Sequence, residues 1–390
     1  MNIRNSGKIP EHLKKLFAAA LALSIALCAG CNGGGEESAA EPISTAESTT
    51  HIPVDESSEA STASTSSGAD SSEPSSISSE ASETSSVPGI SDSNSADSSE
   101  TVSSVTSEPT SEPDPPPVVV VPTISVPYSP GTLTASGANG SIDYSNTSQG
   151  YISVRYTGSN PKVKLQLSCN GRKQPFDIPS DGSTVYIPLI LGNGTYNAYL
   201  GENVAGTATY LEVVNFDFSV SLDSSLAPYL YPNLYTNYSQ NSDCVYKAAE
   251  LCAGKTSDIE KIAAVFGWIT SNVTYDYNLA ATVKSGYIPD PNRTYSRRTG
   301  ICFDYASLLC AMLRSQSIPT RIVDGYASPD IRHAWNEVYT EETGWITPEL
   351  LLKNAGYNIV DSTFYASSTN KPQIASYISN SVNYTAKYYY

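Results

Sequence analysis

The sequence predicts an α+β domain over residues 240–390, in which helices pack on an antiparallel sheet, preceded by an all-β sandwich of immunoglobulin-like type over residues 118–222. Three observations predict this arrangement. Short β-branched runs separated by Gly, Asn, Asp and Ser turns fill the region before residue 222. Helical apolar spacing followed by strand-like runs fills the region after residue 240. The segment before residue 118 has almost no large apolar residues and cannot form a core.

The first 31 residues predict an export signal. An apolar run over residues 16–29 is shorter than a membrane span and follows a cationic head of Arg4, Lys8, Lys14 and Lys15. The run ends in small residues directly before Cys31, a pattern that resembles the bacterial lipobox, in which the cysteine becomes lipidated. We therefore expect an exported protein anchored by lipid to the outer face of a bacterial cell membrane. The alternative is an ordinary cleaved signal.

Residues 32–117 predict a disordered stalk rich in Ser, Thr, Glu and Pro. This segment contains no Lys or Arg and accounts for most of the net charge of −17. From residue 118 onward the charges nearly balance, with 18 basic against 21 acidic residues. Nucleic-acid binding requires a clustered basic surface, so the sequence predicts no nucleic-acid partner.

The predicted sandwich contains several short strands, among them residues 151–156 and 163–167. Asn193-Gly194 lies between the apolar runs 187–191 and 196–200, which predicts a hairpin. We find no catalytic pattern in this region and interpret it as a spacer or as a module that orients a substrate.

The C-terminal region begins with predicted helices. Asp243 is a candidate cap for a helix through residue 251, which Gly254 would end, and a capping box at residues 257–260 precedes an apolar run at 262–273. Residues 275–298, rich in Tyr, Pro, Asn and Gly, predict a loop. A third helix is expected from Cys302 to about residue 315. Strands are expected at residues 321–323, 333–339, 345–346 and 358–361.

Five cysteines remain beyond the signal and stalk, so at least one thiol is unpaired. Cys302 and Cys310 would lie roughly 12 Å apart along one helix, too far for a disulfide. Cys302 falls in the first turn of its helix, where free N–H groups favour a thiolate, whereas Cys310 falls on the apolar face and is expected in the core. No spacing of cysteine or histidine predicts a metal site.

Cys302, His333 and Asp361 are the parts of a thiolate nucleophile in the expected order. His333 is the one histidine of the foldable region and begins a predicted strand. Asp361 would end another strand, where its carboxylate could bond one ring nitrogen and direct the other at Cys302. Taken singly, each residue has an ordinary interpretation: a small buried side chain, a satisfied polar group and a turn former.

The motifs around these residues resemble the transglutaminase-like superfamily of papain-type thiol enzymes, in particular its bacterial surface members. The similar segments are residues 300–306, 318–321, 325–326, 333–338 and 361–364. The resemblance implies Cys302 as nucleophile, His333 as base and Asp361 as its partner. It also makes Tyr275 a candidate oxyanion donor, because the family often has an aromatic residue there.

Two features differ from the family pattern. Ser362 replaces the usual proline of the third motif, and the stretch between Trp345 and Asp361 is longer than in compact members. No acidic cluster resembles the calcium sites of the animal enzymes, so the resemblance implies neither calcium nor another cofactor.

The predicted function is acyl transfer through a thioester on peptide or carboxamide bonds, of the peptidase, amidase or transglutaminase type, with a slight preference for hydrolysis. Protein or peptide substrates, including cell-envelope peptides, are the expected partners. The alternative is a non-catalytic surface binding or adhesion module, because all 27 Tyr, against 7 Phe in the whole chain, lie beyond the stalk. A third interpretation is a stalk protein whose folded end anchors it to the wall.

Overall fold

The computed structural model describes residues 44–45, 117–328, 331–346, 361–378 and 380–390. The predicted signal with Cys31, and the stalk apart from residues 44, 45 and 117, lie outside the described residues. The described part of residues 117–390 belongs to one compact unit, and the predicted borders at 222 and 240 stay predictions. Within these residues no helix has both the length and the apolar character that a membrane crossing requires.

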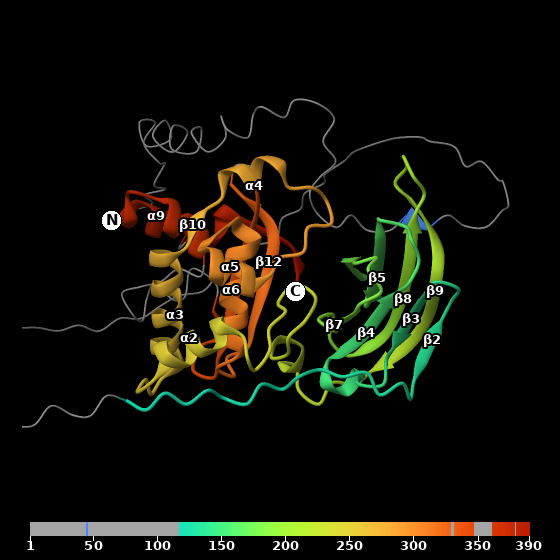
Figure 1. Cartoon of the computed structure of the whole chain (residues 1–390), viewed down its shortest axis with the longest axis horizontal. Coiled ribbons are helices and arrows are strands. Elements are labelled where there is room, and N and C mark those ends of the chain that lie inside the picture. The colour runs from blue at the N-terminus through green and yellow to red at the C-terminus, as the bar shows by residue number, and fades with distance from the viewer. Residues whose placement is uncertain (1–43, 46–116, 329–330, 347–360, 379) are drawn as a thin grey trace, which may run out of the picture. The chain divides into compact units, whose positions relative to one another are not determined.

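Two antiparallel sheets form the β-rich region between residues 134 and 220 (Figure 1). One sheet has the order β2-β3-β4-β7, made of Thr134–Ser136, Gly140–Asp143, Tyr151–Tyr156 and Thr184–Pro188. The other has the order β9-β8-β5-β6, made of Thr209–Val220, Gly194–Asn203, Val163–Cys169 and Arg172–Ile178. The two-residue strand β1 (Ser44–Thr45) runs parallel to β9. Single 3-10 turns occur at η1 (Thr147–Gln149) and η2 (Ala227–Tyr229).

The hairpin predicted around Asn193-Gly194 is wrong. Strand β7 pairs with β4 in one sheet, whereas β8 pairs with β5 and β9 in the other. The apolar run continues past β7 into Leu189 and Leu191, which are both buried in the core. The backbone N–H of Leu189 also donates to Gly150 O at 2.9 Å. Because this run is buried, the chain crosses here from one sheet to the other and does not turn back as a hairpin.

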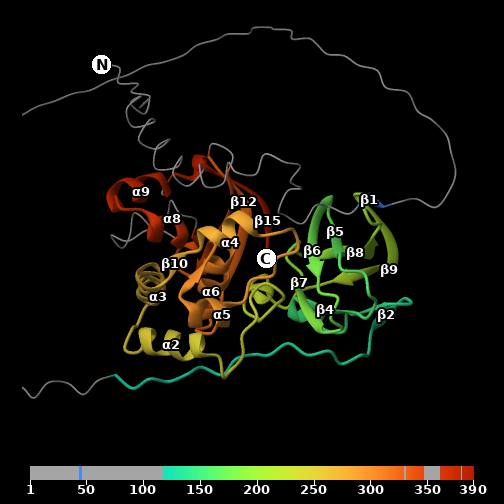
Figure 2. The ribbon, with the colours of Figure 1, turned by 45° about the horizontal axis from the view of Figure 1, so that its top comes forward.

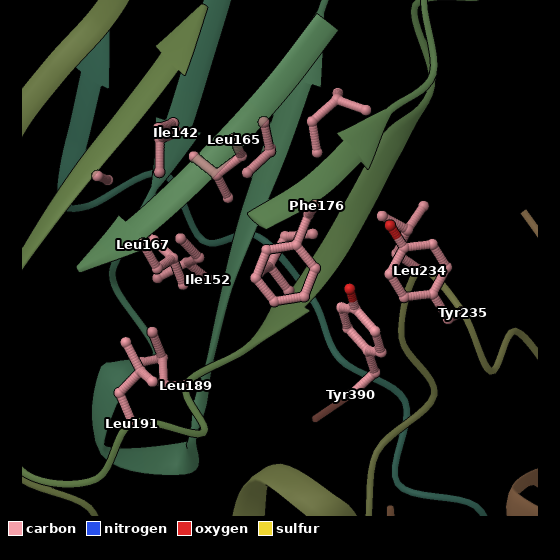
Figure 3. Close-up of a cluster of buried hydrophobic side chains, with 14 of the residues drawn as sticks. Ile142, Ile152, Leu165, Leu167, Phe176, Leu189, Leu191, Leu234, Tyr235 and Tyr390 are labelled. Carbon is pink, nitrogen blue, oxygen red and sulfur yellow. The ribbon is translucent and has the colours of Figure 1, made fainter. Parts of the chain in front are cut away.

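A cluster of buried apolar side chains joins these two sheets and continues into later segments of the chain (Figure 3). Ile152, Leu165 and Phe176 come from the sheets, and Tyr235 and Tyr390 come from later segments. The ring of Tyr390 lies 5.5 Å from that of Phe176 and 4.6 Å from that of Tyr235, measured between centroids. The β-rich region and the C-terminal region therefore share one apolar cluster.

Three longer helices follow, close to their predicted positions: α2 (Asp243–Cys252), α3 (Asp258–Asn272) and α6 (Cys302–Arg314). The predicted capping box of α3 is confirmed, since Ser257 Oγ accepts from Glu260 N at 3.3 Å and Glu260 Oε2 accepts from Ser257 N at 3.1 Å. Asp243 is not the cap of α2. Ser242 occupies that position, and Asp243 lies in the first turn, where its charge suits the helix dipole.

The predicted loop at 275–298 contains two short helices, α4 (Tyr277–Thr282) and α5 (Pro291–Arg297). Each begins after an aspartate whose carboxylate caps it, Asp276 for α4 and Asp290 for α5. The composition of the segment concealed these helices, because a single turn or two needs only a cap and little apolar periodicity.

The C-terminal sheet is antiparallel and has the order β14-β13-β12-β15. Its strands are Gly344–Ile346, Ile331–Thr340, Thr320–Ala327 and Tyr384–Tyr389. Figures 1 and 2 show α6 beside this sheet, and Asn336 Nδ2 of β13 donates to Ala306 O of α6 at 3.0 Å. The remaining elements are the parallel pair β10 (Thr274–Tyr275) and β11 (Thr299–Gly300), and α8 (Ser362–Ser367), α9 (Lys371–Ile378) and η3 (Ser381–Asn383).

Candidate active site

Cys302 is the first residue of α6, and its side chain is half-buried. Ile301 precedes the helix in an extended conformation, and its backbone N–H donates to Asp304 Oδ2 at 2.9 Å. The free N–H groups of the first helical turn carry partial positive charge. The structure thus places Cys302 where the sequence predicted it.

Asp304 fixes the turn that carries Cys302. Its buried carboxylate accepts from Tyr287 Oη at 2.7 Å, and Tyr287 Oη in turn accepts from Arg293 Nη2 at 2.8 Å. Burial raises the pKa of Asp304, against the lowering effects of Tyr287, the Ile301 N–H and the Arg293 charge. Gly300 leaves room for this carboxylate, because a Cβ there would lie 2.5 Å from Asp304 Cβ.

His333 lies on β13 and is buried, with 3% of its surface exposed. Its Nε2 is 2.7 Å from Asp361 Oδ2, and its side chain lines the same cleft as Cys302. The imidazole stacks on the ring of Phe364, with centroids 4.1 Å apart and an interplanar angle of 8°. Burial alone would lower the pKa of His333, but the charge of Asp361 and the bonds to Asp361 and Cys302 raise it to about 10. The ring is therefore an imidazolium at neutral pH.

Asp361 is fully buried and begins α8 as its N-cap. Oδ1 accepts from Phe364 N at 3.0 Å, and Oδ2 accepts from Tyr384 Oη at 2.8 Å as well as bonding His333. The predicted strand ending at Asp361 falls mainly on residues outside the described ones. Ser362 stands at the first helical position, where the backbone N–H needs no intrahelical partner, so serine serves there as well as the usual proline.

A cleft of about 70 Å³ adjoins the thiol and the imidazole, with room for several water molecules. Its walls include the ion pair of Arg332 and Asp324, in which Arg332 Nε donates to Asp324 Oδ1 at 2.7 Å. They also include Asp177 of β6, so the β-rich region contributes to the cleft. The complete lining is Asp177, Tyr235, Val283, Gly286, Tyr287, Ile301, Cys302, Phe303, Asp324, Arg332, His333, Ala334 and Tyr390.

Tyr275 lies near this site without lining the cleft. It pairs with Gly300 across β10 and β11, and its ring is 5.0 Å from that of Tyr277. The role of Tyr275 as an oxyanion donor stays a prediction.

The described residues contain no group of three or more His, Cys, Asp and Glu that could hold a metal ion. The five cysteines from Cys169 onward are free. Cys310 is buried in the core, as predicted, with its sulfur accepting from Asn336 Nδ2 at 3.2 Å, and burial raises its pKa to about 11.

Sequence reasoning missed several residues at this site, among them Tyr384, Tyr287 and Asp177. Tyr384 comes from a tyrosine-rich run whose composition predicts only a half-exposed strand. Tyr287 and Asp177 reach the site from a turn-rich segment and from the sandwich. Only the fold brings them near Cys302, so no local sequence pattern could have identified them.

Residues 246–349 match the family described as the transglutaminase-like superfamily. Among curated proteins, the chain is 28% identical over 120 residues to the uncharacterized protein YebA of Bacillus subtilis, covering 26% of this chain and 16% of YebA. It is 32% identical over 75 residues to the UPF0252 protein MJ1282 of Methanocaldococcus jannaschii, covering 18% of this chain and 20% of that protein. The chain thus spans a fifth or less of the length of these relatives.

A solved structure of the periplasmic domain of TgpA from Pseudomonas aeruginosa is also similar. It is 16% identical, with a TM-score of 0.28, and the match covers 64% of this chain and 79% of that chain.

Proposed function

We propose that the chain, whose residues 246–349 match the transglutaminase-like superfamily, is a cysteine-dependent acyl-transfer enzyme acting on peptide or carboxamide bonds. One observation carries the proposal: Cys302, at the start of α6, lines the same cleft as the buried imidazole of His333, whose Nε2 lies 2.7 Å from Asp361 Oδ2. In such a Cys–His–Asp arrangement the carboxylate orients the imidazole and the imidazole activates the thiol, which suits nucleophilic catalysis.

The chemistry follows from the charge of His333. The Cys302 thiolate attacks the carbonyl carbon, and the C–N bond breaks as the imidazolium gives its proton to the leaving amine. The resulting thioester is attacked by water or by an amine, whose proton returns to His333 as the thiolate departs. The oxyanion would bond the Cys302 backbone N–H and a second donor, for which Tyr275 is the candidate. Water gives hydrolysis, and an amine gives a cross-link.

The setting of this reaction is part of the proposal. We place the enzyme on the outer face of a bacterial membrane, anchored through lipidated Cys31 and a stalk over residues 32–117, with envelope peptides as substrates. The sandwich, which we take as immunoglobulin-like, contributes Asp177 to the cleft.

The test is acyl-enzyme trapping. The full chain is incubated with envelope peptides, with and without an added alkylamine, and both protein and products are analysed by mass spectrometry. We expect an acyl adduct on Cys302, with free acid from water or an amide from the amine. Cys302→Ala should abolish turnover, a loss on the order of 10⁴-fold or more.

Cys310→Ala is the matched control, because that thiol is buried in the core and should leave acylation intact. An adduct confined to another cysteine, or none at all, would contradict the enzyme proposal. Retention of peptide binding and of cellular function by Cys302→Ala would instead favour the surface-binding alternative.

A further inference from the structure

Three donors surround the carboxylate of Asp361, although a His partner alone would suffice for a Cys–His–Asp site. His333 Nε2 and Tyr384 Oη lie 2.7 Å and 2.8 Å from the same oxygen, Oδ2. The backbone N–H of Phe364 occupies the other oxygen at 3.0 Å. Asp361 has no exposed surface, so these donors replace the solvation that water would otherwise provide.

Tyr384 is held firmly enough to act on this carboxylate. It begins β15, which pairs with β12, and its ring packs 5.0 Å from that of Trp335. Burial, the negative charge of Asp361 and the hydrogen bond to it raise the pKa of Tyr384. The hydroxyl therefore keeps its proton at neutral pH and is available as a donor.

We propose that Tyr384 is a positioning residue, whose hydroxyl fixes the rotation of the Asp361 carboxylate beside His333. This inference rests on the proposed function. A carboxylate bonded on both oxygens cannot rotate about its Cβ–Cγ bond without losing a bond to a buried partner, which is costly. Tyr384 thus affects the nucleophile indirectly: it positions Asp361, and Asp361 in turn orients His333.

The proposal has a defined pH signature. A hydrogen bond to the charged form of an acid favours that form, so Tyr384→Phe should make the Asp361 carboxylate easier to protonate. Protonation there removes the charge that sustains the imidazolium, and with it the thiolate of Cys302. Among the described residues, the other titratable groups that face Asp361 are His333 on β13 and Tyr377 on α9. Burial and Asp361 raise the pKa of Tyr377 to about 12, so Tyr377 does not titrate in the range concerned.

Alkylation of Cys302 by iodoacetamide measures this effect without any substrate. The full chain is reacted at a series of pH values, and modification is followed on the Cys302 peptide by mass spectrometry. For Tyr384→Phe we expect a loss in rate on the order of 10- to 100-fold at neutral pH, the range for one hydrogen bond to a charged group. The acid limb of the pH–rate curve should also move to higher pH.

Tyr305→Phe is the matched control, because it removes a buried hydroxyl whose bond goes to Val273 O at 2.7 Å instead. It should lower thermal stability while leaving the pH–rate curve in place. A second comparison places Tyr384→Phe in an Asp361→Asn background, where its effect should vanish if it acts through Asp361.

The outcomes separate the two proposals. If wild-type Cys302 reacts as an ordinary thiol at every pH, the proposed function fails. If wild-type Cys302 is hyper-reactive but Tyr384→Phe matches it in rate and pH dependence, only the role of Tyr384 fails. An effect of equal size in the Asp361→Asn background would also overturn that role.

Discussion

His333 keeps its positive charge because its environment offers negative charge on one side and a thiol on the other. Burial works against an imidazolium, yet the Asp361 carboxylate outweighs it and raises the pKa of His333 to about 10. Phe364 covers one face of the ring, so the charge is held in a fixed orientation and away from water. Both consequences suit the proton-transfer role that we propose for His333.

The raised pKa links His333 to stability. In the unfolded chain the pKa of histidine is ordinary, 6.5, whereas in the folded chain it is about 10. Between these values the folded state binds a proton that the unfolded state has released, so the stabilisation is complete below pH 6.5 and disappears as the pH rises through about 10. We expect wild type to exceed His333→Gln in free energy of unfolding by a margin that shrinks over this range, measured by urea denaturation.

Buried cysteines also titrate at alkaline pH, but they are common to both proteins and cancel in the difference. A margin that stays constant from about pH 6 to 10 would show that His333 is not charged in the folded state.

The sequence could nominate Cys302, His333 and Asp361 as site candidates because each lies in a local motif, and their catalytic roles stay predictions. Gly300 and Asp304 flank Cys302, and Trp335 and Asn336 follow His333. Tyr384 carries no such motif. Its partner is 23 residues away in the sequence, and the bond between them depends on how β15 pairs with β12.

At the scale of elements, the start of α6 determines where Cys302 lies. Gly300 has no side chain, which lets Asp304 fold back on the Ile301 N–H and close the first turn. A Cβ at position 300 would meet both Cβ and Cγ of Asp304, at 2.5 Å and 3.1 Å. The Cβ is fixed to the helix backbone, so this clash cannot be relieved by a side-chain rotation.

We therefore expect Gly300→Ala to displace the turn that carries Cys302. The free energy of unfolding should fall by about 1–3 kcal/mol, the usual cost of overpacking. Alkylation of Cys302 should slow in the same variant. Chemical denaturation and iodoacetamide labelling provide the two measurements.

Gly267→Ala is a matched control within α3, because nothing lies within 4 Å of the added Cβ. It should stabilise the protein by about 0.4–1 kcal/mol through the unfolded chain and leave Cys302 unchanged. If Gly300→Ala behaved like this control, the turn would be more tolerant than its geometry indicates.

Elements with strong local signals could be predicted well. The capping box of α3, the apolar face of α6 and the strand at β13 were recognisable because cap, periodicity and alternation agree with the final fold. The short helices α4 and α5 lack an apolar period, and the Asn193-Gly194 turn was misassigned because sheet membership depends on distant partners.

At the scale of the whole molecule, aromatic packing joins the β-rich region to the C-terminal sheet. Phe176 of β6 contacts Tyr390 beyond β15, and Tyr235 packs against both. Tyr235 and Tyr390 also line the cleft next to Cys302. The same rings therefore complete the core and form part of the candidate substrate surface.

Phe176→Ala should destabilise the protein by about 3–5 kcal/mol, the usual cost of removing a buried aromatic ring. Because Tyr390 loses a neighbour, amide hydrogen exchange in β12 and β15 should accelerate, as measured by mass spectrometry. Phe218→Ala removes a similar ring that packs against Tyr196 and Phe216 inside the sandwich. If both variants changed exchange in β12 and β15 equally, the coupling would not pass through Phe176.

The unpaired sulfurs described above have a practical consequence for handling the protein. No covalent cross-link ties together the five cysteines from Cys169 onward, so dithiothreitol leaves the scaffold intact. Four of these sulfurs are shielded from solvent, and Cys302 alone is partly accessible. We therefore expect air to oxidise Cys302 before the four buried cysteines, without disturbing the fold.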